Sequence, residues 1–106
     1  MFARQVSLQL KPNSVVEFTQ TIAKDIIPLL RQQPGFQDEI ACVVPGGTEA
    51  VSVSLWDHKE RADASHHRTY PVVLSVLVNV VEGTPPVHTY VVSNSTFHKI
   101  VVRATV

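Results

Sequence analysis

The spacing of hydrophobic positions changes several times along the chain, and each spacing predicts one element of secondary structure. Residues 2–10 alternate between apolar and polar side chains, which is typical of a strand with one buried face. After a short turn, apolar residues recur every three or four positions as far as Leu30, as in an amphipathic helix. Ser14 and Glu17 have the spacing of a capping box at the start of this helix. Pro28 predicts a kink or an irregular final turn.

Two strands separated by a tight turn are predicted next. The first, residues 36–44, follows the helix-ending Pro34-Gly35, and the turn after it is Pro45-Gly46-Gly47. We expect the inner face of this strand to be formed by Ile40, Cys42 and Val44. The second strand alternates strictly over residues 48–56, with one face formed by Val51, Val53 and Leu55 and the other by Ala50, Ser52, Ser54 and Trp56. The two runs predict a β-hairpin.

A second helix and further extended segments follow the hairpin. Asp57 and Glu60 repeat the capping-box spacing and predict a helix that begins at residue 58. Its second half, residues 70–81, is apolar and rich in valine, so a buried strand is the alternative on propensity alone. A Gly-Thr-Pro-Pro break precedes a strand at 87–92, and residues 97–106 are expected to form an extra edge strand or an arm.

The predicted order β-α-β-β-α-β is that of the ferredoxin-like α+β fold, an antiparallel sheet with two helices on one face. The 106 residues are expected to form a single domain over 1–106. The strands are apolar on both faces, so a monomer would expose an apolar patch on the open side of its sheet. Pairing two sheets into a dimeric α+β barrel buries that side, and we therefore expect a homodimer.

Composition and charge exclude several classes of function. Nine basic and nine acidic residues give a net charge of zero, and no cluster of Lys or Arg is present to bind a nucleic-acid backbone. The longest apolar run is too short to cross a bilayer, which takes about 20 residues. Cys42 is the only cysteine, so no internal disulfide forms, and we expect it to be a small buried hydrophobe in a strand. With no signal peptide at Met1, the expected location is the cytoplasm.

Several short segments over about residues 2–93 resemble one known family. They are Phe2-Ala3-Arg4, Leu8-Gln9-Leu10-Lys11-Pro12, Glu17-Phe18, Ile27-Pro28-Leu29-Leu30, Gln33-Pro34-Gly35-Phe36, Trp56 and Val81-Glu82-Gly83. Together they resemble the antibiotic-biosynthesis monooxygenase superfamily of dimeric α+β barrels. The resemblance implies a fold more than a chemistry, because such barrels carry several unrelated activities.

The resemblance implies three kinds of activity, and the chain departs from the pattern of two. Members include cofactor-independent oxygenases of polycyclic phenols, quinol oxygenases and haem-degrading enzymes. The phenol oxygenases have an Asn four residues before the Trp, where this chain has Ser52. The haem degraders use a helical Trp, a helical His and a strand Asn, and the corresponding positions here are Ser65, Ser75 and Ser7.

A small group of residues can nevertheless carry chemistry on a phenol or quinol. His66 and Tyr70 are four residues apart on one helical face, so His66 is the candidate base that takes the phenol proton and Tyr70 the residue that orients the substrate oxygen. The candidate substrate-binding residues are Trp56, Arg4 and His67. Each has a structural alternative: Trp56 is a core aromatic, the histidines belong to a solvated half-helix, and Arg4 is paired or reaches along the sheet to solvent.

Other catalytic classes lack their motifs. The five histidines, His58, His66, His67, His88 and His98, show no metal-binding spacing, and no nucleophile elbow or glycine-rich phosphate loop is present. We therefore expect no metal and no cofactor. The first hypothesis is a cofactor-independent monooxygenase of a small aromatic phenol or quinol. The alternative is a non-enzymatic dimeric barrel that binds a small apolar ligand or has a structural role.

Overall fold

The computed structural model describes residues 1–100. The elements along the chain are β1 (Phe2–Leu10), α1 (Val15–Thr21), η1 (Ile22–Ile26), α2 (Ile27–Arg31), β2 (Phe36–Val43), β3 (Glu49–Trp56), α3 (Lys59–Leu77), β4 (Val81–Glu82) and β5 (Val87–Val91). The apolar segment after Tyr70 is therefore helical, and the alternative of a buried strand is wrong. No strand occurs at residues 97–100, and the rest of the arm predicted at 97–106 lies outside the described residues.

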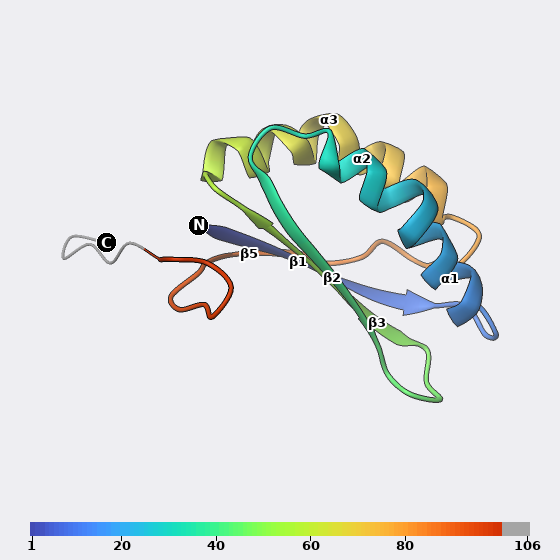
Figure 1. The fold of residues 1–106 in the computed structure, drawn as a ribbon. Coiled ribbons are helices and arrows are strands. Elements are labelled where there is room, and N and C mark those ends of the chain that lie inside the picture. The colour runs from blue at the N-terminus through green and yellow to red at the C-terminus, as the bar shows by residue number, and fades with distance from the viewer. Residues whose placement is uncertain (101–106) are drawn as a thin grey trace.

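The strands described form one antiparallel sheet with the helices on one face, as Figure 1 shows. β1 is central and pairs with β3, which in turn pairs with the edge strand β2. On its other side β1 pairs with β5 along its first half and with β4 at its end. This arrangement confirms the predicted ferredoxin-like α+β fold, because the β-α-β-β-α-β order requires a central first strand.

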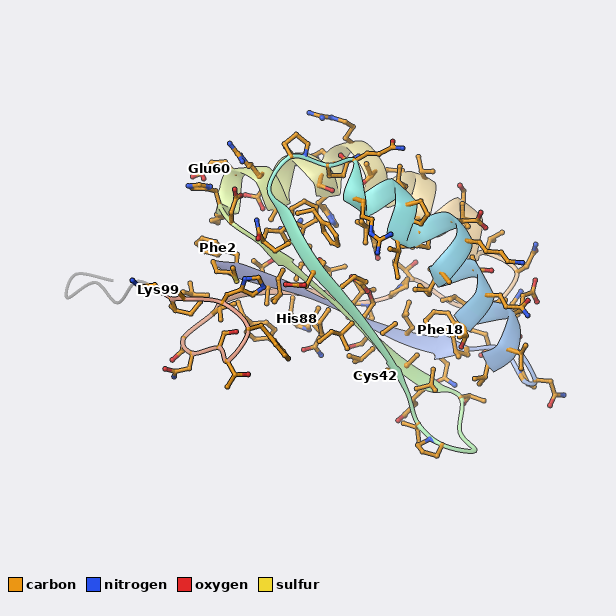
Figure 2. All side chains as sticks on the ribbon, viewed as in Figure 1. Phe2, Phe18, Cys42, Glu60, His88 and Lys99 are labelled. Carbon is orange, nitrogen blue, oxygen red and sulfur yellow. The ribbon has the colours of Figure 1, made fainter. Side chains whose placement is uncertain are left out.

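The hydrophobic core lies between the sheet and the helices. β1 contributes Leu8 and Leu10, and the first helical region contributes a stripe at helical spacing, formed by Phe18, Ile22, Ile26 and Leu30. Phe18 is only 1% exposed and lies between α1 and the sheet in Figure 2. α3 contributes Ala62 and Leu77 to the same core. The side chains that recur every two residues on the strands and about every 3.6 residues on the helices therefore face the same core.

The irregular turn predicted at Pro28 is found just before it and ends at Ile26, two residues earlier. η1 is a π-helical turn in which the N–H of Ile27 bonds the carbonyl of Ile22, five residues back. Proline has no N–H to donate, and its ring collides with the carbonyl four residues earlier in a regular helix. A wider turn relieves this collision, and the helix resumes as α2.

The predicted inner face of β2 is wrong. Ile40 and Val44 are each 47% exposed, Cys42 is exposed as well, and the strand ends one residue before Val44. The cause is a β-bulge between Phe36 and Asp38, where β2 carries one residue more than its partner β3. A shift of one residue moves every following side chain to the other face of the sheet.

The two predicted capping boxes are also absent. Ser14 does occupy the N-cap position of α1, but its side chain makes no capping hydrogen bond. α3 begins after His58 rather than Asp57. The Asp57 carboxylate bonds instead to Arg61, with an Oδ2–Nη1 distance of 2.9 Å. The helices are therefore held mainly by the packing of their apolar faces, without hydrogen bonds from capping side chains.

Gly35 joins α2 to β2 and is expected to tolerate no side chain. Its φ is +82°, and an added Cβ would overlap Asp57 Oδ1 and the Arg61 side chain. Gly46 has a similar φ of +70° but open space around it, so Gly46→Ala is the matched control. We expect Gly46→Ala to cost about 1 kcal/mol of unfolding free energy, and Gly35→Ala about 1–3 kcal/mol more. Urea unfolding of both variants measures the difference, and equal losses would contradict the overlap.

Candidate functional site

A cavity of about 70 Å³ lies between the sheet and the helices. The helical wall is mostly apolar and is formed by Ile22, Ile26, Leu30, Val73, Leu74 and Leu77. The polar side chains at the cavity come from β1, β2, β3 and α3, and they are Arg4, Glu39, Ser52, Ser54, Trp56, Ser65, His66, Thr69 and Tyr70. An apolar pocket with a few convergent polar groups is the usual form of a small-molecule site.

The structure brings four of the five residues predicted from the sequence to this cavity. Arg4, Trp56, His66 and Tyr70 line it, although they come from β1, from the end of β3 and from α3. His67 does not line it, because the side chain following His66 on the helix is turned to solvent. His67 is therefore removed from the candidate substrate-binding set.

His66 and Tyr70 are the two polar residues with aromatic rings on the helical wall, beside Ser65 and Thr69. Their rings are stacked, with centroids 4.6 Å apart and planes inclined by 21°. Within residues 1–100, neither the buried His66 Nδ1 nor the buried Tyr70 hydroxyl has a hydrogen-bond partner. Burial lowers the pKa of His66, and the charges of Arg4 and His67 lower it further. His66 is therefore neutral at neutral pH, with a lone pair available to accept a proton.

Burial also governs the hydroxyl of Tyr70. It raises the pKa of this group above its usual value of 10.0. Tyr70 therefore keeps its proton at neutral pH and can donate a hydrogen bond to an oxygen atom in the cavity. The two side chains of the stack thus offer one acceptor and one donor to the same region of the cavity.

The guanidinium of Arg4 is occupied by hydrogen bonds and an ion pair within the protein. Its Nη2 pairs with Asp63 at 2.7 Å, its Nη1 donates to the carbonyl of Ala62 at 3.0 Å, and its Nε donates to Thr89 at 3.2 Å. The side chain is 12% exposed. These bonds tie β1 to α3 and β5, so the paired alternative describes Arg4 better than a role in holding a ligand.

Trp56 lines the cavity and is also a core residue, since it is only 2% exposed. Its indole N–H donates to Ser54 Oγ, with a nitrogen–oxygen distance of 2.8 Å. Its ring packs edge-on against that of Phe36, and the two ring centroids are 5.6 Å apart. The indole N–H is therefore occupied. Trp56 offers a ligand the surface of its ring and no hydrogen bond.

Glu39 is a cavity residue that sequence reasoning missed. It lies on β2 after the bulge, which turns its side chain to the helical face, and the hydroxyl of Ser52 donates to its Oε1. Burial raises the pKa of Glu39 from 4.5 to about 7, although the hydrogen bond from Ser52 opposes this shift. Its Oε2 is buried and has no partner within residues 1–100. A strict alternation of residues 36–44 places Glu39 on the opposite face, so only recognition of the bulge would have found it.

The described part of the chain offers neither a metal centre nor a membrane span. Residues 1–100 contain no group of three or more His, Cys, Asp or Glu side chains arranged to hold a metal ion. Over the same residues no helix combines the length and the apolar character needed to cross a membrane.

Comparisons with known proteins identify the fold. No family model matches the sequence, and no curated protein sequence matches it either. Among solved structures, the monooxygenase from the gene ActVA-Orf6 of Streptomyces coelicolor, in complex with nanaomycin D, has a TM-score of 0.72 at 14% identity, with 92% of each chain covered. SnoaB, a cofactor-independent oxygenase from Streptomyces nogalater, has a TM-score of 0.73 at 11% identity, with 90% of this chain and 95% of that chain covered.

A third structure carries the family name itself. It is a protein from Bordetella bronchiseptica proposed to be an antibiotic biosynthesis monooxygenase, with a TM-score of 0.73 at 14% identity and coverage of 88% of this chain and 97% of that chain. The protein therefore has an α+β ferredoxin-like fold of the antibiotic biosynthesis monooxygenase type. The resemblance found in the sequence is confirmed at the level of fold, and at these identities the matches show the fold alone.

Proposed function

We propose that the cavity is the substrate site of a cofactor-independent monooxygenase that acts on a small aromatic phenol or quinol. One observation carries this proposal. His66 and Tyr70 line the cavity, and His66 Nδ1 and the Tyr70 hydroxyl are buried with no hydrogen-bond partner within residues 1–100. Buried polar groups almost always have partners, so a ligand with an oxygen atom at this place would supply the missing bonds.

The two residues have distinct roles in the proposed reaction. Neutral His66 takes the proton of the phenolic hydroxyl, and Tyr70 donates a hydrogen bond to the resulting phenolate oxygen. Dioxygen then oxidises the electron-rich ring. For a substrate whose keto tautomer contains a ring CH2 group, this carbon becomes C=O: one oxygen atom enters the product and the other leaves as water with the two hydrogens. All four electrons that reduce dioxygen come from the substrate, so no separate reductant is needed.

Two of the structural matches support this class of reaction. One is a monooxygenase solved with nanaomycin D and another is a cofactor-independent oxygenase. The apolar helical wall of the cavity and the ring of Trp56 suit a flat aromatic molecule.

The second candidate function is a non-enzymatic barrel that binds a small apolar ligand. Ser52 favours it, because this residue stands where the phenol oxygenases of the resembling family carry Asn, and its hydroxyl is already bonded to Glu39. Binding of an aromatic ligand without oxygen consumption would support this non-enzymatic function.

Oxygen uptake by the purified protein with a panel of quinols and anthrones tests the proposal. These compounds autoxidise, so heat-denatured protein and the double variant Trp56→Phe, His66→Ala provide the backgrounds. We expect saturable uptake well above both backgrounds, with one atom of labelled dioxygen incorporated into the product. Uptake at the background rate with every compound would contradict an oxygenase and leave the ligand-binding alternative.

The open face of the sheet supports the proposed homodimer. The register of the strands places seven apolar side chains on the face turned away from the helices: Ala3, Ile40, Cys42, Val51, Val53, Leu55 and Tyr90. Ile40 is 47% exposed and Tyr90 50% exposed in the single chain. An apolar sheet face of this kind is usually covered, and a second copy of the sheet would close the barrel predicted from the sequence. The exposed Cys42 would then be buried.

Val53→Lys is expected to prevent this dimer from forming. Val53 lies in the middle of the open face, opposite Ile40 and beside Gln5. Burying a lysine ammonium between two apolar sheets without a partner is strongly unfavourable. Val16→Lys is the matched control, because Val16 is 70% exposed on α1, away from the sheet. Sedimentation equilibrium should show a dimer for the control and a monomer for Val53→Lys, and a dimeric Val53→Lys would exclude this face as the interface.

A further inference from the structure

Glu39 is a polar residue on the sheet side of the cavity, whereas the His66–Tyr70 stack belongs to the helical side. Glu39 reaches the cavity from β2, and the Ser52 hydroxyl from β3 fixes one of its oxygens, Oε1. The other oxygen, Oε2, is buried and has no partner within residues 1–100. A buried carboxyl oxygen without a partner is costly, so the arrangement needs either a functional or a structural reason.

No positive charge within residues 1–100 compensates Glu39. The charged and titratable groups that share its cavity are Arg4 on β1 and His66 and Tyr70 on α3, and the adjoining helical turns η1 and α2 contribute only apolar side chains. Arg4 is paired with Asp63, and none of the ion pairs in the described chain includes Glu39. With Arg4 already paired, burial favours the protonated carboxyl, in agreement with a pKa of about 7.

The hydrogen bond from Ser52 decides which oxygen carries the proton. Because the Ser52 hydroxyl donates to Oε1, the proton of the neutral carboxyl resides on Oε2. Oε2 is then the O–H donor of a residue that lines an apolar cavity, and its missing partner is a hydrogen-bond acceptor. A ketone or quinone carbonyl is an acceptor that carries no charge and can therefore enter such a cavity at low cost.

We propose that Glu39, oriented by Ser52, donates a hydrogen bond to a carbonyl oxygen of the substrate, so that the cavity selects phenols that carry a second, ketone oxygen. The inference rests on the proposed function of the same cavity and narrows its substrate class to hydroxyaryl ketones. The phenol end of such a molecule meets His66 and Tyr70 on the helical wall, and the ketone end meets Glu39 on the sheet wall.

Two phenols with the same ring skeleton test the inference without any turnover. They are 7-hydroxy-1-tetralone, which has the ketone, and 5,6,7,8-tetrahydro-2-naphthol, which lacks it. Binding to the whole protein is followed by quenching of the single Trp56. At about pH 6 the wild-type protein should bind the ketone about tenfold more tightly, the usual worth of one hydrogen bond. The preference should fall as the pH rises through about 7, because an ionised carboxylate repels a carbonyl oxygen.

Substitutions at Glu39 separate hydrogen bonding from shape. Glu39→Leu removes the donor and should abolish the preference at every pH. Glu39→Gln keeps an N–H donor and cannot ionise, so its preference should remain and lose its pH dependence. Glu49→Leu is the matched control, because Glu49 is exposed at the start of β3 and does not line this cavity. Ser52→Ala should weaken the preference, since the orienting bond is lost.

The infrared carbonyl band of bound 7-hydroxy-1-tetralone gives a readout that needs no variant. It should shift to lower frequency on binding at about pH 6 and return toward its free value at about pH 8. Equal affinities of the wild type for the two phenols, an unshifted band, or a preference that survives Glu39→Leu would overturn the inference. If the ketone preference is present while oxygen uptake stays at background, the monooxygenase proposal fails and the Glu39 site stands. Oxygen uptake without a ketone preference would overturn the Glu39 site and leave the monooxygenase proposal standing.

Discussion

Replacing His66 with alanine is expected to lower kcat/KM for oxygen uptake by about 10²- to 10⁴-fold, the range typical of a lost general base. The phenol would have to lose its proton to water, and the phenolate that reacts with dioxygen would be scarce. Burial and the neighbouring charges of Arg4 and His67 lower the pKa of His66, so the neutral base predominates in the wild type at neutral pH. The effect of the variant should therefore be largest above about pH 6.5.

The pH dependence of the wild-type rate checks the same role. Protonation of His66 should reduce kcat/KM on the acid side, with an apparent pKa below 6.5. If the substrate is a hydroxyaryl ketone, ionisation of Glu39 should reduce it again above about pH 7. Glu39→Gln would then remove the alkaline limb and leave the acid limb unchanged. A rate that stays flat below pH 6.5 would argue against His66 as the base.

His67→Ala is the matched control for His66→Ala. His67 is the next residue on α3, is exposed and does not line the cavity. Its removal should leave the rate within about twofold of the wild type, because it reaches the site only through His66: the two ring centroids are 6.2 Å apart, and the charge of His67 lowers the pKa of His66. Circular dichroism and urea unfolding show whether both variants keep the fold. Equal loss of activity in the two variants would assign the effect to the helix rather than to the imidazole of His66.

The order of elements could be predicted from the sequence because each element carries its own period. Residues 2–10 alternate as the central strand β1, and the stripe ending at Leu30 faces the core as α1, η1 and α2. Two residues four apart on a helix, His66 and Tyr70, remain neighbours in any fold that keeps the helix. For this reason the proximity of His66 and Tyr70 could be predicted from the sequence, whereas the burial of their polar atoms could not.

The face of β2 could not be predicted, and with it Glu39 was missed. A strict alternation starting from Phe36 assigns Ile40 and Cys42 to the core and Glu39 to the other face. The bulge before Asp38 reverses this assignment. No residue type in this segment predicts a bulge, because the bulge arises from the pairing of β2 with β3. The environment of Arg4 was similarly hidden, because its partner Asp63 is 59 residues away in the sequence.

Glu39→Gln is expected to stabilise the protein at alkaline pH and to leave its stability at acid pH almost unchanged. Folding raises the pKa of Glu39 from 4.5 to about 7. The stability that the protonated Glu39 carboxyl contributes is therefore complete below about pH 4.5. It is lost as the pH rises through about 7, because the folded protein must then ionise a buried carboxyl. The full shift corresponds to about 3 kcal/mol of unfolding free energy. Glutamine has the same shape and never ionises, so the variant avoids this loss.

Urea unfolding of the wild type and Glu39→Gln across the range from about pH 4.5 to about pH 8.5 measures this difference directly. All other titrating groups are common to the two proteins, so their contributions cancel in the comparison. We expect nearly equal midpoints at the acid end, and a variant more stable by up to about 3 kcal/mol at the alkaline end. Glu49→Gln, at an exposed position on the neighbouring strand, should follow the wild-type curve. Parallel curves for the wild type and Glu39→Gln would mean that the Glu39 carboxyl reaches solvent, and that the cavity lacks the neutral O–H donor assigned to it.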